Sequence, residues 1–287
     1  MTANILEKRI LACQNAYYNG QSLISDADFD RLRDRLGREK PQSPVLESVG
    51  APASGPFPKA RHIAPMGSLD KIKHPVRLRY WLLDMGAPAY SVQFKLDGAS
   101  LELQYRDGVF VRAVTRGDGV TGSDITLNAL RMGGVLPVLD IPFTGGIRGE
   151  VLLPRATWRE KYNGRKTSRD IGNGIMLRKD SRECEELVFI AYDAAVSGDD
   201  GFFTSETGKI MWLRERGFSV TETKEFSDPE AVIAWLEAAE KIRLSYPVDS
   251  DGLVIKDCRT DMNDLRRPRP RKQIAFKPCE QPEDAAV

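Results

Sequence analysis

Residues 90–115, YSVQFKLDGASLELQYRDGVFVRAVT, carry the pattern that decides the fold. Apolar and β-branched side chains are frequent in the runs 90–94, 99–105 and 109–115, which is typical of strands. Asp107-Gly108 falls between the last two runs, and this dipeptide favours a tight hairpin turn. The stretch therefore predicts antiparallel strands.

Elements on either side of this stretch extend the prediction. Strands are expected at 187–192 and 252–256, and helices near 205–216 and 229–243. Strands and helices do not alternate regularly, so the pattern favours a mixed, mainly antiparallel α+β fold over a doubly wound parallel sheet.

Residues 1–40 have helical periodicity. The first helix is expected to end near Asn19-Gly20, and the second to begin at Ser25 with a capping box to Asp28. The Pro-, Ser- and Gly-rich residues 41–60 predict a linker. We therefore expect a small helical domain with its linker over 1–60 and a larger domain over 61–287.

Composition excludes several classes of protein. Hydrophobic residues at 41% and charged residues at 29% are typical of a soluble globular protein. The net charge of +1 leaves any affinity for nucleic acid to local patches. No apolar run reaches the ~20 residues of a membrane span. Two histidines and four unpaired, scattered cysteines give no zinc-site spacing and suggest a reducing, cytoplasmic location.

Lys95 is the first candidate for chemistry, within Phe94-Lys95-Leu96-Asp97-Gly98. A lysine is a nucleophile when burial or neighbouring cations lower the pKa of its amine. Asp97 lies on the same side of an extended chain and can orient that amine. Gly98 allows a nucleotide to approach the backbone. Taken alone, this segment is equally compatible with a surface turn.

Four further segments follow it: Arg116-Gly-Asp-Gly119, Arg148-Gly-Glu150, Asp251-Gly-Leu-Val-Ile-Lys256 and Ile274-Ala-Phe-Lys277. Each one could be an ordinary turn or strand end. Together, in this order, they resemble the motifs of the covalent nucleotidyltransferases, which are the DNA ligases, RNA ligases and capping enzymes. The resemblance implies that family's ATP-grasp-like ligase fold and a covalent lysyl-nucleotide on Lys95.

The resemblance also implies roles for the other motif residues. Lys256 and Lys277 each end a strand and are expected to converge, with Arg178, on the reacting phosphate, where negative charge develops. Arg116 and Glu150 are expected to hold the ribose. Glu150 and Asp251 are candidate ligands for Mg²⁺, which would shield the phosphates.

The N-terminal segment selects the NAD-dependent branch. Tyr17-Tyr18 and Ile24-Ser-Asp26-Ala-Asp28-Phe29-Asp30 are similar to the helical segment with which NAD-dependent DNA ligases bind nicotinamide mononucleotide (NMN). Carboxylates beside an aromatic ring suit a cationic nicotinamide, although acids in a first helical turn also favour the helix dipole. His62 to Asp70 is a second branch-specific match, and it places Ser68 and Leu69 near the adenosine.

The chain departs from this family at several positions. Gln93 stands where Glu is usual; it can accept from the adenine amino group but carries no charge. Phe29 stands where Tyr is usual. The segment 167–178 replaces a longer motif, with Arg169 and Arg178 matching its arginines.

Full-length relatives are expected to continue into an OB-fold, a zinc finger, helix-hairpin-helix repeats and often a BRCT domain, and residues 278–287 stop where the OB-fold linker would run. We therefore expect a monomer, either cut at a domain boundary or naturally short, that adenylates itself, binds nicked double-stranded DNA weakly and seals it little or not at all. Its candidate DNA contacts are the basic stretches 165–182 and 266–272, the second of which could equally be a solvated loop. The alternatives are an ATP- or GTP-dependent RNA ligase or capping enzyme, and a non-catalytic NAD- or DNA-binding module.

Overall fold

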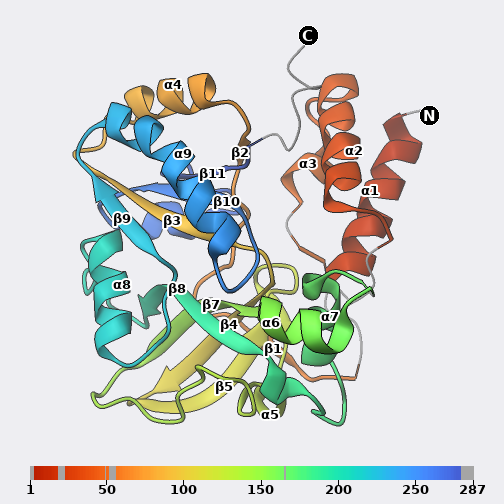
Figure 1. The fold of residues 1–287 in the computed structure, drawn as a ribbon, viewed down its shortest axis with the longest axis vertical. Coiled ribbons are helices and arrows are strands. Elements are labelled where there is room, and N and C mark those ends of the chain that lie inside the picture. The colour runs from red at the N-terminus through yellow and green to blue at the C-terminus, as the bar shows by residue number, and fades with distance from the viewer. Residues whose placement is uncertain (1–2, 19–22, 49, 52–55, 165, 279–287) are drawn as a thin grey trace.

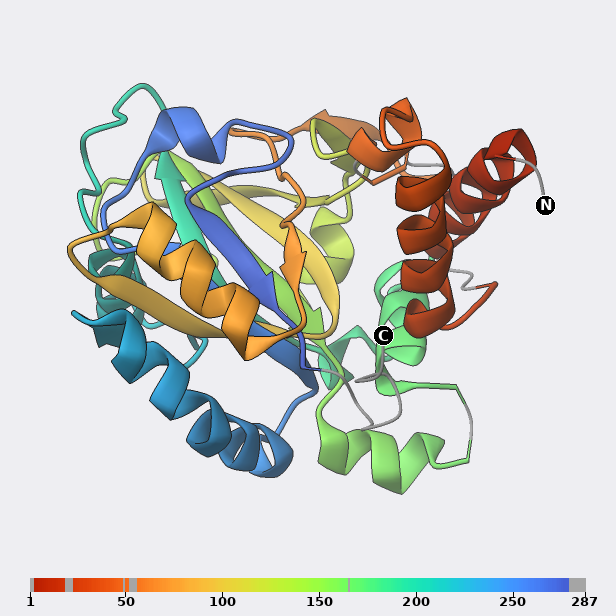
Figure 2. The same cartoon turned by 90° about the horizontal axis from the view of Figure 1, so that it is seen from above.

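The computed structural model describes residues 3–18, 23–48, 50–51, 56–164 and 166–278, without the side chains of Tyr18 and Asp26. Two large sheets stack in the body of the molecule, and a small group of helices lies at one side (Figures 1 and 2). The structure is mixed α+β with mainly antiparallel pairing, which confirms the predicted fold class.

The N-terminal helices are α1 (Ala3–Tyr18), α2 (Asp26–Glu39) and α3 (Pro44–Glu47). The Ser25 hydroxyl caps α2 by accepting from the Asp28 amide and donating to the Asp28 carboxylate, which confirms the capping box. Leu6, Ile10, Leu36 and Val45 form a small core of their own. Short helices gain most of their stability from such packing.

The first large sheet has the order β2-β11-β10-β3-β9. Its strands are β2 (Lys71–Ile72), β3 (Tyr90–Leu96), β9 (Thr223–Phe226), β10 (Ser250–Asp257) and β11 (Gln273–Phe276). Only the β2–β11 pair is parallel. Helices α4 (Pro75–Met85) and α9 (Pro229–Ser245) pack on one face, where Leu78 and Val232 join the apolar side chains of β3, β10 and β11.

The second large sheet has the order β5-β4-β7-β8 and is wholly antiparallel. Its strands are β4 (Ala99–Arg106), β5 (Val109–Thr115), β7 (Gly145–Leu152) and β8 (Val188–Val196). The main core lies on one face and is shared with α8 (Glu206–Glu215) and α7 (Ser168–Met176). The predicted hairpin is confirmed, with Asp107 at φ 50° and Gly108 at φ 77°.

Smaller elements complete the described chain. A two-stranded sheet pairs β1 (Lys59–Arg61) with β6 (Thr121–Ser123), and short helices are α5 (Thr126–Ala129), α6 (Arg155–Thr157), the π-helix η1 (Trp158–Tyr162), the 3₁₀ helix η2 (Cys184–Glu186) and α10 (Met262–Leu265). The linker predicted over 41–60 is therefore wrong in part, because α3 and β1 fall within it.

Side chains along β3, β10 and β11 point alternately to the two faces of the first sheet. One face is an apolar core and the other lines a cavity. Tyr90, Val92 and Phe94 point into the apolar core, whereas Gln93 and Lys95 line a cavity on the other face. Successive side chains of a strand point to opposite sides, so one strand can serve both a core and a site. The facing residues of β4, β7 and β8 close the cavity from the second sheet.

Two β-bulges change which way cavity residues point. In β10 the register with β3 shifts between Ser250 and Gly252, so Asp251 is the extra residue. In β8 the partner of β7 shifts from Asp193 to Ala191, so Tyr192 is the extra residue. A bulge re-aims a side chain that regular pairing would direct elsewhere, and both extra residues line the cavity.

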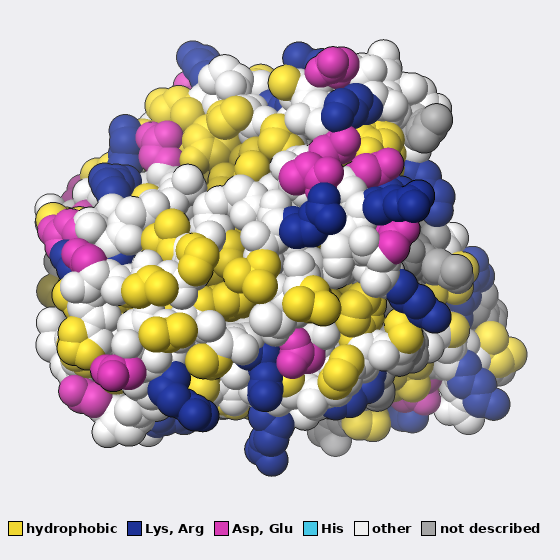
Figure 3. All heavy atoms as spheres, turned by 90° about the horizontal axis from the view of Figure 1, so that it is seen from below, with side chains coloured by type: hydrophobic (Ala, Val, Ile, Leu, Met, Phe, Trp, Pro, Cys, Tyr) yellow, Lys and Arg dark blue, Asp and Glu magenta, His cyan; other side chains and the backbone are white. Residues whose placement is uncertain are grey.

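The face seen from below carries hydrophobic side chains between charged ones (Figure 3). Exposed large hydrophobic residues include Val109 and Val111 of β5 and Leu127 in α5, and these three do not line the cavity. Strand β5 and helix α5 lie near the lower edge of Figure 1. Among the described residues, no helix combines the length and apolar character needed to span a bilayer.

Gly252 is required by the bulge in β10. Its φ is +148°, and a Cβ there would lie 2.1 Å from the Phe276 carbonyl oxygen. We expect Gly252→Ala to lower the free energy of unfolding by at least about 2 kcal/mol, because backbone strain and a clash with main chain add together. Urea denaturation measures this change.

Gly174→Ala is the matched control. Gly174 lies in α7, and a Cβ added there would have no described atom of another segment within 4 Å. Alanine at this position should raise the free energy of unfolding by about 0.5–1 kcal/mol, through helix propensity alone. Equal effects of the two substitutions would contradict the role given to the bulge.

Candidate functional site

A cavity of about 1310 Å³ lies between the two large sheets and extends to the N-terminal helices. Its walls include Lys95 from β3, Glu150 from β7, Tyr192 from β8 and Asp251 from β10. The cavity therefore brings Lys95 and Asp251 together although they lie 156 positions apart in the sequence.

Asp251 lies between two lysines. The Lys95 ammonium is 3.1 Å from the Asp251 carboxylate, and the Lys277 ammonium donates to the same carboxylate. Lys277 directly follows β11, whose residue Phe276 pairs with Leu253. Burial acts to raise the pKa of Asp251, but the charges of Lys95 and Lys277 outweigh it and lower that pKa. Asp251 is therefore a shared anion for both lysines.

The pKa of the Lys95 amine differs from the expectation. About three-quarters of its side chain is shielded from solvent. Burial acts to lower the pKa of the amine, but the carboxylates of Asp251, Asp97 and Glu150 outweigh burial, and the pKa is raised. The predicted lowering of this pKa is therefore wrong for the protein alone. The amine is an ammonium at neutral pH and must lose a proton before it can attack.

Asp97 forms an ion pair with Arg169 of α7. Arg169 Nη1 of α7 lies 2.7 Å from Asp97 Oδ1, and the Arg169 guanidinium lies 4.6 Å from the centre of the Tyr17 ring. Burial lowers the pKa of Arg169. Arg169 therefore connects α1 to the carboxylate two residues from Lys95.

Glu150 lies across the cavity from β3. The Ser100 hydroxyl donates to the Glu150 carboxylate at 3.0 Å, from the paired position on β4. Burial raises the pKa of Glu150 to about 7, although Lys95 and Ser100 act to lower it. Glu150 is therefore close to half-protonated at neutral pH, and a bound cation or hydrogen-bond donor would favour its carboxylate form.

Arg116 and Ser68 meet on another wall. The Arg116 guanidinium donates to the Ser68 hydroxyl at 2.8 Å and to the Gly67 carbonyl at 2.7 Å. Both predicted residues line the cavity, as does Leu69. The segment 67–68 packs tightly on residues 267–268, where a Cβ on Gly67 would lie 2.8 Å from two backbone oxygens.

Lys256 lies at the other end of β10 from Asp251. It pairs with Ser91 and Gln273, whereas Gly252 pairs with Lys95. β10 and β11 are antiparallel, so their C-terminal ends lie at opposite edges of the sheet. Both lysines nevertheless line the cavity, and their convergence at one phosphate stays a prediction.

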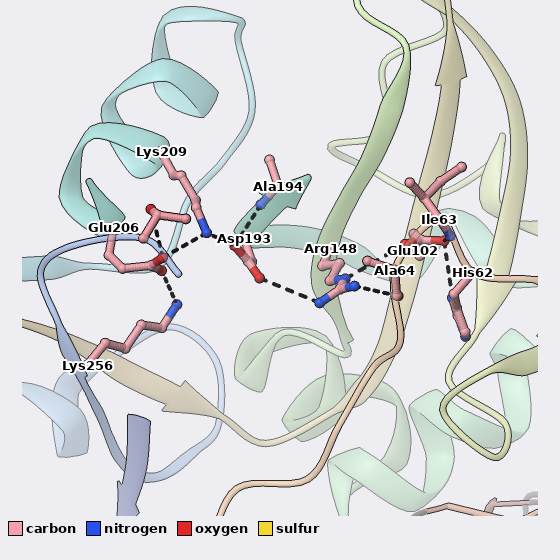
Figure 4. A network of polar contacts seen from close by, with 11 residues as sticks. His62, Ile63, Ala64, Glu102, Arg148, Asp193, Ala194, Glu206, Lys209 and Lys256 are labelled. Carbon is pink, nitrogen blue, oxygen red and sulfur yellow. Dashed lines mark hydrogen bonds and ion pairs between the residues drawn. The ribbon is translucent and has the colours of Figure 1, made fainter. Parts of the chain in front are cut away.

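Lys256 instead ends a buried ladder of alternating charges (Figure 4). Lys256 donates to Glu206 at 3.0 Å, and Lys209 lies 2.8 Å from both Glu206 and Asp193. The ladder continues from Asp193 through Arg148 to Glu102, and His62 Nδ1 lies 3.1 Å from Glu102. Burial acts to raise the pKa of Asp193, but the charges of Lys209 and Lys256 outweigh it and lower that pKa.

The N-terminal residues reach the outer part of the cavity. Tyr17, Phe29 and Asp30 line it, and Asp30 pairs with Lys71 of β2 at 2.6 Å. Burial and the charge of Lys277 lower the pKa of Lys71. The side chains of Tyr18 and Asp26, also predicted to bind the cofactor, lie outside the described part of the structure.

Arg178 differs from the prediction, whereas DNA contact by the basic stretches stays a prediction. Arg178 does not line the cavity, and its guanidinium pairs with Glu183. In the stretch 266–272, carboxylates pair with Arg266, Arg267, Arg269 and Lys272. These internal partners reduce the charge that the stretch can offer to a phosphate backbone.

The two predicted metal ligands both face the cavity. Glu150 and Asp251 act electrostatically on Lys95 from different strands. Within the described ranges, no group of three or more His, Cys, Asp or Glu side chains is placed to hold a metal ion. Mg²⁺ commonly binds through one or two carboxylates together with substrate phosphates, and two carboxylates fit that arrangement.

Several site residues were missed by sequence reasoning. Tyr192, Ser100 and Lys71 line the cavity, and only Ser100 carried a signal, through its place next to Lys95-x-Asp-Gly. The helix α7 was also missed, although Thr167 and Asp170 form a capping pair of the kind that marks a helix start.

The chain was compared with known proteins. Residues 54–277 match the family model described as NAD-dependent DNA ligase adenylation domain. A DNA ligase of Treponema denticola is 42% identical over 95% of this chain and 44% of its own length. A DNA ligase of Treponema pallidum is 40% identical over 95% of this chain and 35% of its own length. The chain thus spans less than half the length of these relatives.

Solved structures share a weaker similarity. A mycobacterial DNA ligase D complexed with ATP and MES covers 79% of this chain and 60% of that chain, at 15% identity and a TM-score of 0.40. An archaeal ATP-dependent RNA ligase covers 75% of this chain and 48% of that chain, at 13% identity and a TM-score of 0.45.

Removing one charge from the ladder should destabilise the protein strongly. Lys209 is fully buried between two carboxylates. We expect Lys209→Met to lower the free energy of unfolding by about 3–5 kcal/mol, because Asp193 and Glu206 would lose a shared buried partner. The control is Arg131→Met, which breaks an exposed pair with Glu185 and should cost less than about 1 kcal/mol. Equal losses in urea denaturation would refute this account.

Ionisation of the Glu150 carboxyl should lower the free energy of unfolding as the pH rises. Its carboxyl ionises near pH 4.5 in the unfolded chain and near pH 7 in the folded protein, so the folded state binds more protons between these values. The stability of the wild type relative to Glu150→Gln should therefore fall between pH 5 and 8, by up to about 3 kcal/mol. A flat difference across that range would show that Glu150 titrates normally.

Proposed function

This chain belongs to the NAD-dependent DNA ligase adenylation domain family, and from that premise we propose that Lys95 takes AMP from NAD. The Lys95 amine attacks the adenylyl phosphorus, a nitrogen–phosphorus bond forms, and the phosphoanhydride bond to NMN breaks. NMN leaves with the bridging oxygen, and AMP remains on the lysine as a phosphoramidate.

One observation carries this proposal: Lys95 lies in a cavity large enough for a dinucleotide, beside Asp251 and within its shared ion pair with Lys277. A largely shielded lysine with fixed carboxylate and ammonium neighbours suits nucleophilic attack on a phosphate better than a solvated surface lysine does. The cluster supports group transfer at this position.

Asp251 has two tasks in the proposed reaction. It hydrogen-bonds the Lys95 amine, so it is placed to receive or relay the proton that the amine must lose. When a phosphate enters, Lys277 can exchange its contact with Asp251 for the phosphate oxygens. A fixed ammonium at that position stabilises the charge that develops as the leaving group departs.

The remaining walls suit the two halves of NAD. Glu150 and Arg116 can hold the ribose, with Ser68 beside Arg116. Toward the outer end, Tyr17, Phe29 and Asp30 offer aromatic and acidic groups that suit the cationic nicotinamide of NMN. Arg169, stacked on Tyr17, would link occupancy of this outer end to Asp97. We extend this NMN role to Tyr18 and Asp26 on the family resemblance alone.

Mg²⁺ would enter this site with the phosphates of NAD. Glu150 and Asp251 are the residues that would hold it. When bound, the ion supplies charge that offsets the phosphate oxygens and weakens the electrostatic hold of these carboxylates on the Lys95 proton.

The activity of the complete protein is a further proposal. The relatives of this chain are named DNA ligases, and in a longer chain AMP would pass from Lys95 to the 5′-phosphate of nicked DNA. A monomer acting in the cytoplasm would fit this role. The rival donor is ATP, which lacks a nicotinamide half and would leave Tyr17 and Phe29 without a partner.

Lys95→Ala should abolish covalent labelling. We expect the wild type to gain the mass of one AMP when incubated with NAD and Mg²⁺, and Lys95→Ala to gain none while it remains folded. Intact-mass spectrometry measures both, after NMN has been used to discharge any AMP already bound. Lys161→Ala, which removes an exposed lysine paired with Glu186, should label as the wild type does.

Labelling by ATP and not by NAD would overturn the choice of donor. Labelling of Lys95→Ala would place the nucleophile elsewhere, and no labelling of the wild type by either nucleotide would favour a non-catalytic binding module.

A further inference from the structure

Gln93 presents an unusual group at the inner end of the cavity. The residue is 2% exposed and lines the cavity, two residues before Lys95 on the same face of β3. Its side-chain Nε2 is buried and has no hydrogen-bond partner among the described residues. A buried amide donor without a partner is costly, so this atom is suited to a group that a ligand brings.

Relative burial indicates which part of the dinucleotide reaches Gln93. Gln93 is 2% exposed, whereas the Lys95 side chain is 26% exposed, so Gln93 lies deeper in the cavity than the attacking amine. In the function proposed above, the nicotinamide half contacts Tyr17 and Phe29 at the outer part of the cavity. The base attached to the adenylyl phosphate would then extend toward Gln93 and its β10 partner Val254, which line the cavity together with Tyr192.

The amide of Gln93 can serve two kinds of purine. A side-chain amide has an acceptor and donors, and a half-turn about its last torsion exchanges their positions. Its oxygen can accept from a 6-amino group while its nitrogen donates to N1. After the half-turn, its nitrogen can donate to a 6-oxo group while its oxygen accepts from N1–H.

We propose, on the basis of the function proposed above, that Gln93 sets the base specificity of this chain and lets it use dinucleotides with either a 6-amino or a 6-oxo purine. With nicotinamide hypoxanthine dinucleotide, the Lys95 nitrogen forms its bond to the inosine-bearing phosphorus and the bond to NMN breaks. IMP then remains on Lys95 and NMN is released, as in the reaction with NAD.

The neighbouring groups do not impose a choice between the two bases. Tyr192 and Val254 offer ring and aliphatic contacts, which every purine face accepts. Lys256 lies two residue pairs along the β10–β3 ladder from the Val254–Gln93 pair, and its ammonium is held by Glu206 at 3.0 Å. The selection between amino and oxo groups therefore falls to Gln93.

The test compares the full chain, discharged with NMN, on NAD and on nicotinamide hypoxanthine dinucleotide. Intact mass identifies the AMP or IMP adduct, and single-turnover rates over a range of concentrations give kcat/KM for each. We expect the wild type to form both adducts, with kcat/KM values within about tenfold of each other, since one amide can form a matched pair with each base.

Gln93→Glu and Gln93→Leu both remove the amide donor. A carboxylate only accepts, so it can pair with the 6-amino group of adenine or with N1–H of a 6-oxo purine, but it opposes N1 of adenine and the 6-oxo oxygen. Gln93→Glu should therefore raise KM for both dinucleotides by about ten- to a hundredfold and leave kcat little changed, because the base is remote from the reacting phosphorus. Gln93→Leu, which neither donates nor accepts, should raise KM for both dinucleotides and leave their ratio near that of the wild type.

Two results would overturn the inference. One is a wild type that forms the AMP adduct but rejects the hypoxanthine dinucleotide by more than a hundredfold. The other is a KM that stays unchanged for both dinucleotides in Gln93→Glu and Gln93→Leu. A wild type that forms neither adduct would instead refute the proposed function itself, so the two failures are distinguishable.

Discussion

The ion pair that Asp251 shares between Lys95 and Lys277 is the interaction on which the site depends. It exists because β10 has one extra residue at Asp251, and because Gly252 adopts a φ of +148° that other residues rarely adopt. Without this bulge, the carboxylate would be directed to the opposite face of the strand from Lys95. The same carboxylate raises the pKa of Lys95, so the nucleophile is stored as an ammonium and needs the substrate and its cation to become reactive.

A second constraint is that one strand serves two buried environments. β3 sends Tyr90, Val92 and Phe94 into the core under α4 and α9, and it sends Gln93 and Lys95 into the cavity. Any substitution that shifted the register of β3 by one residue would exchange these two sets. The buried ladder of polar contacts from Lys256 to His62 connects this sheet to the second one. Loss of one charged member would leave its neighbours in the ladder as buried, unpaired charges.

The chemical character of the lining side chains changes along the cavity. Its outer end is aromatic and acidic, its middle carries the two lysines and their carboxylates, and its inner end holds the Gln93 amide beside Tyr192. Arg169 spans the first two regions, since it stacks on Tyr17 and pairs with Asp97. The small helical core of α1, α2 and α3 therefore bears directly on the chemistry at β3, although it has few apolar contacts of its own.

The sequence by itself determined the strand hairpin, the helices α1, α2, α8 and α9, and the family, because these depend on local periodicity, turn residues and motif order. Only the tertiary structure decided which motif residues meet. Two lysines that each end a strand lie at opposite edges when the strands are antiparallel, so Lys256 joins Glu206 and Lys277 joins Asp251. Tyr192 and Asp251 enter the cavity through bulges, and Arg178 leaves it for Glu183. Strand direction, register shifts and ion-pair partners all arise from contacts between distant segments, and no local pattern encodes them.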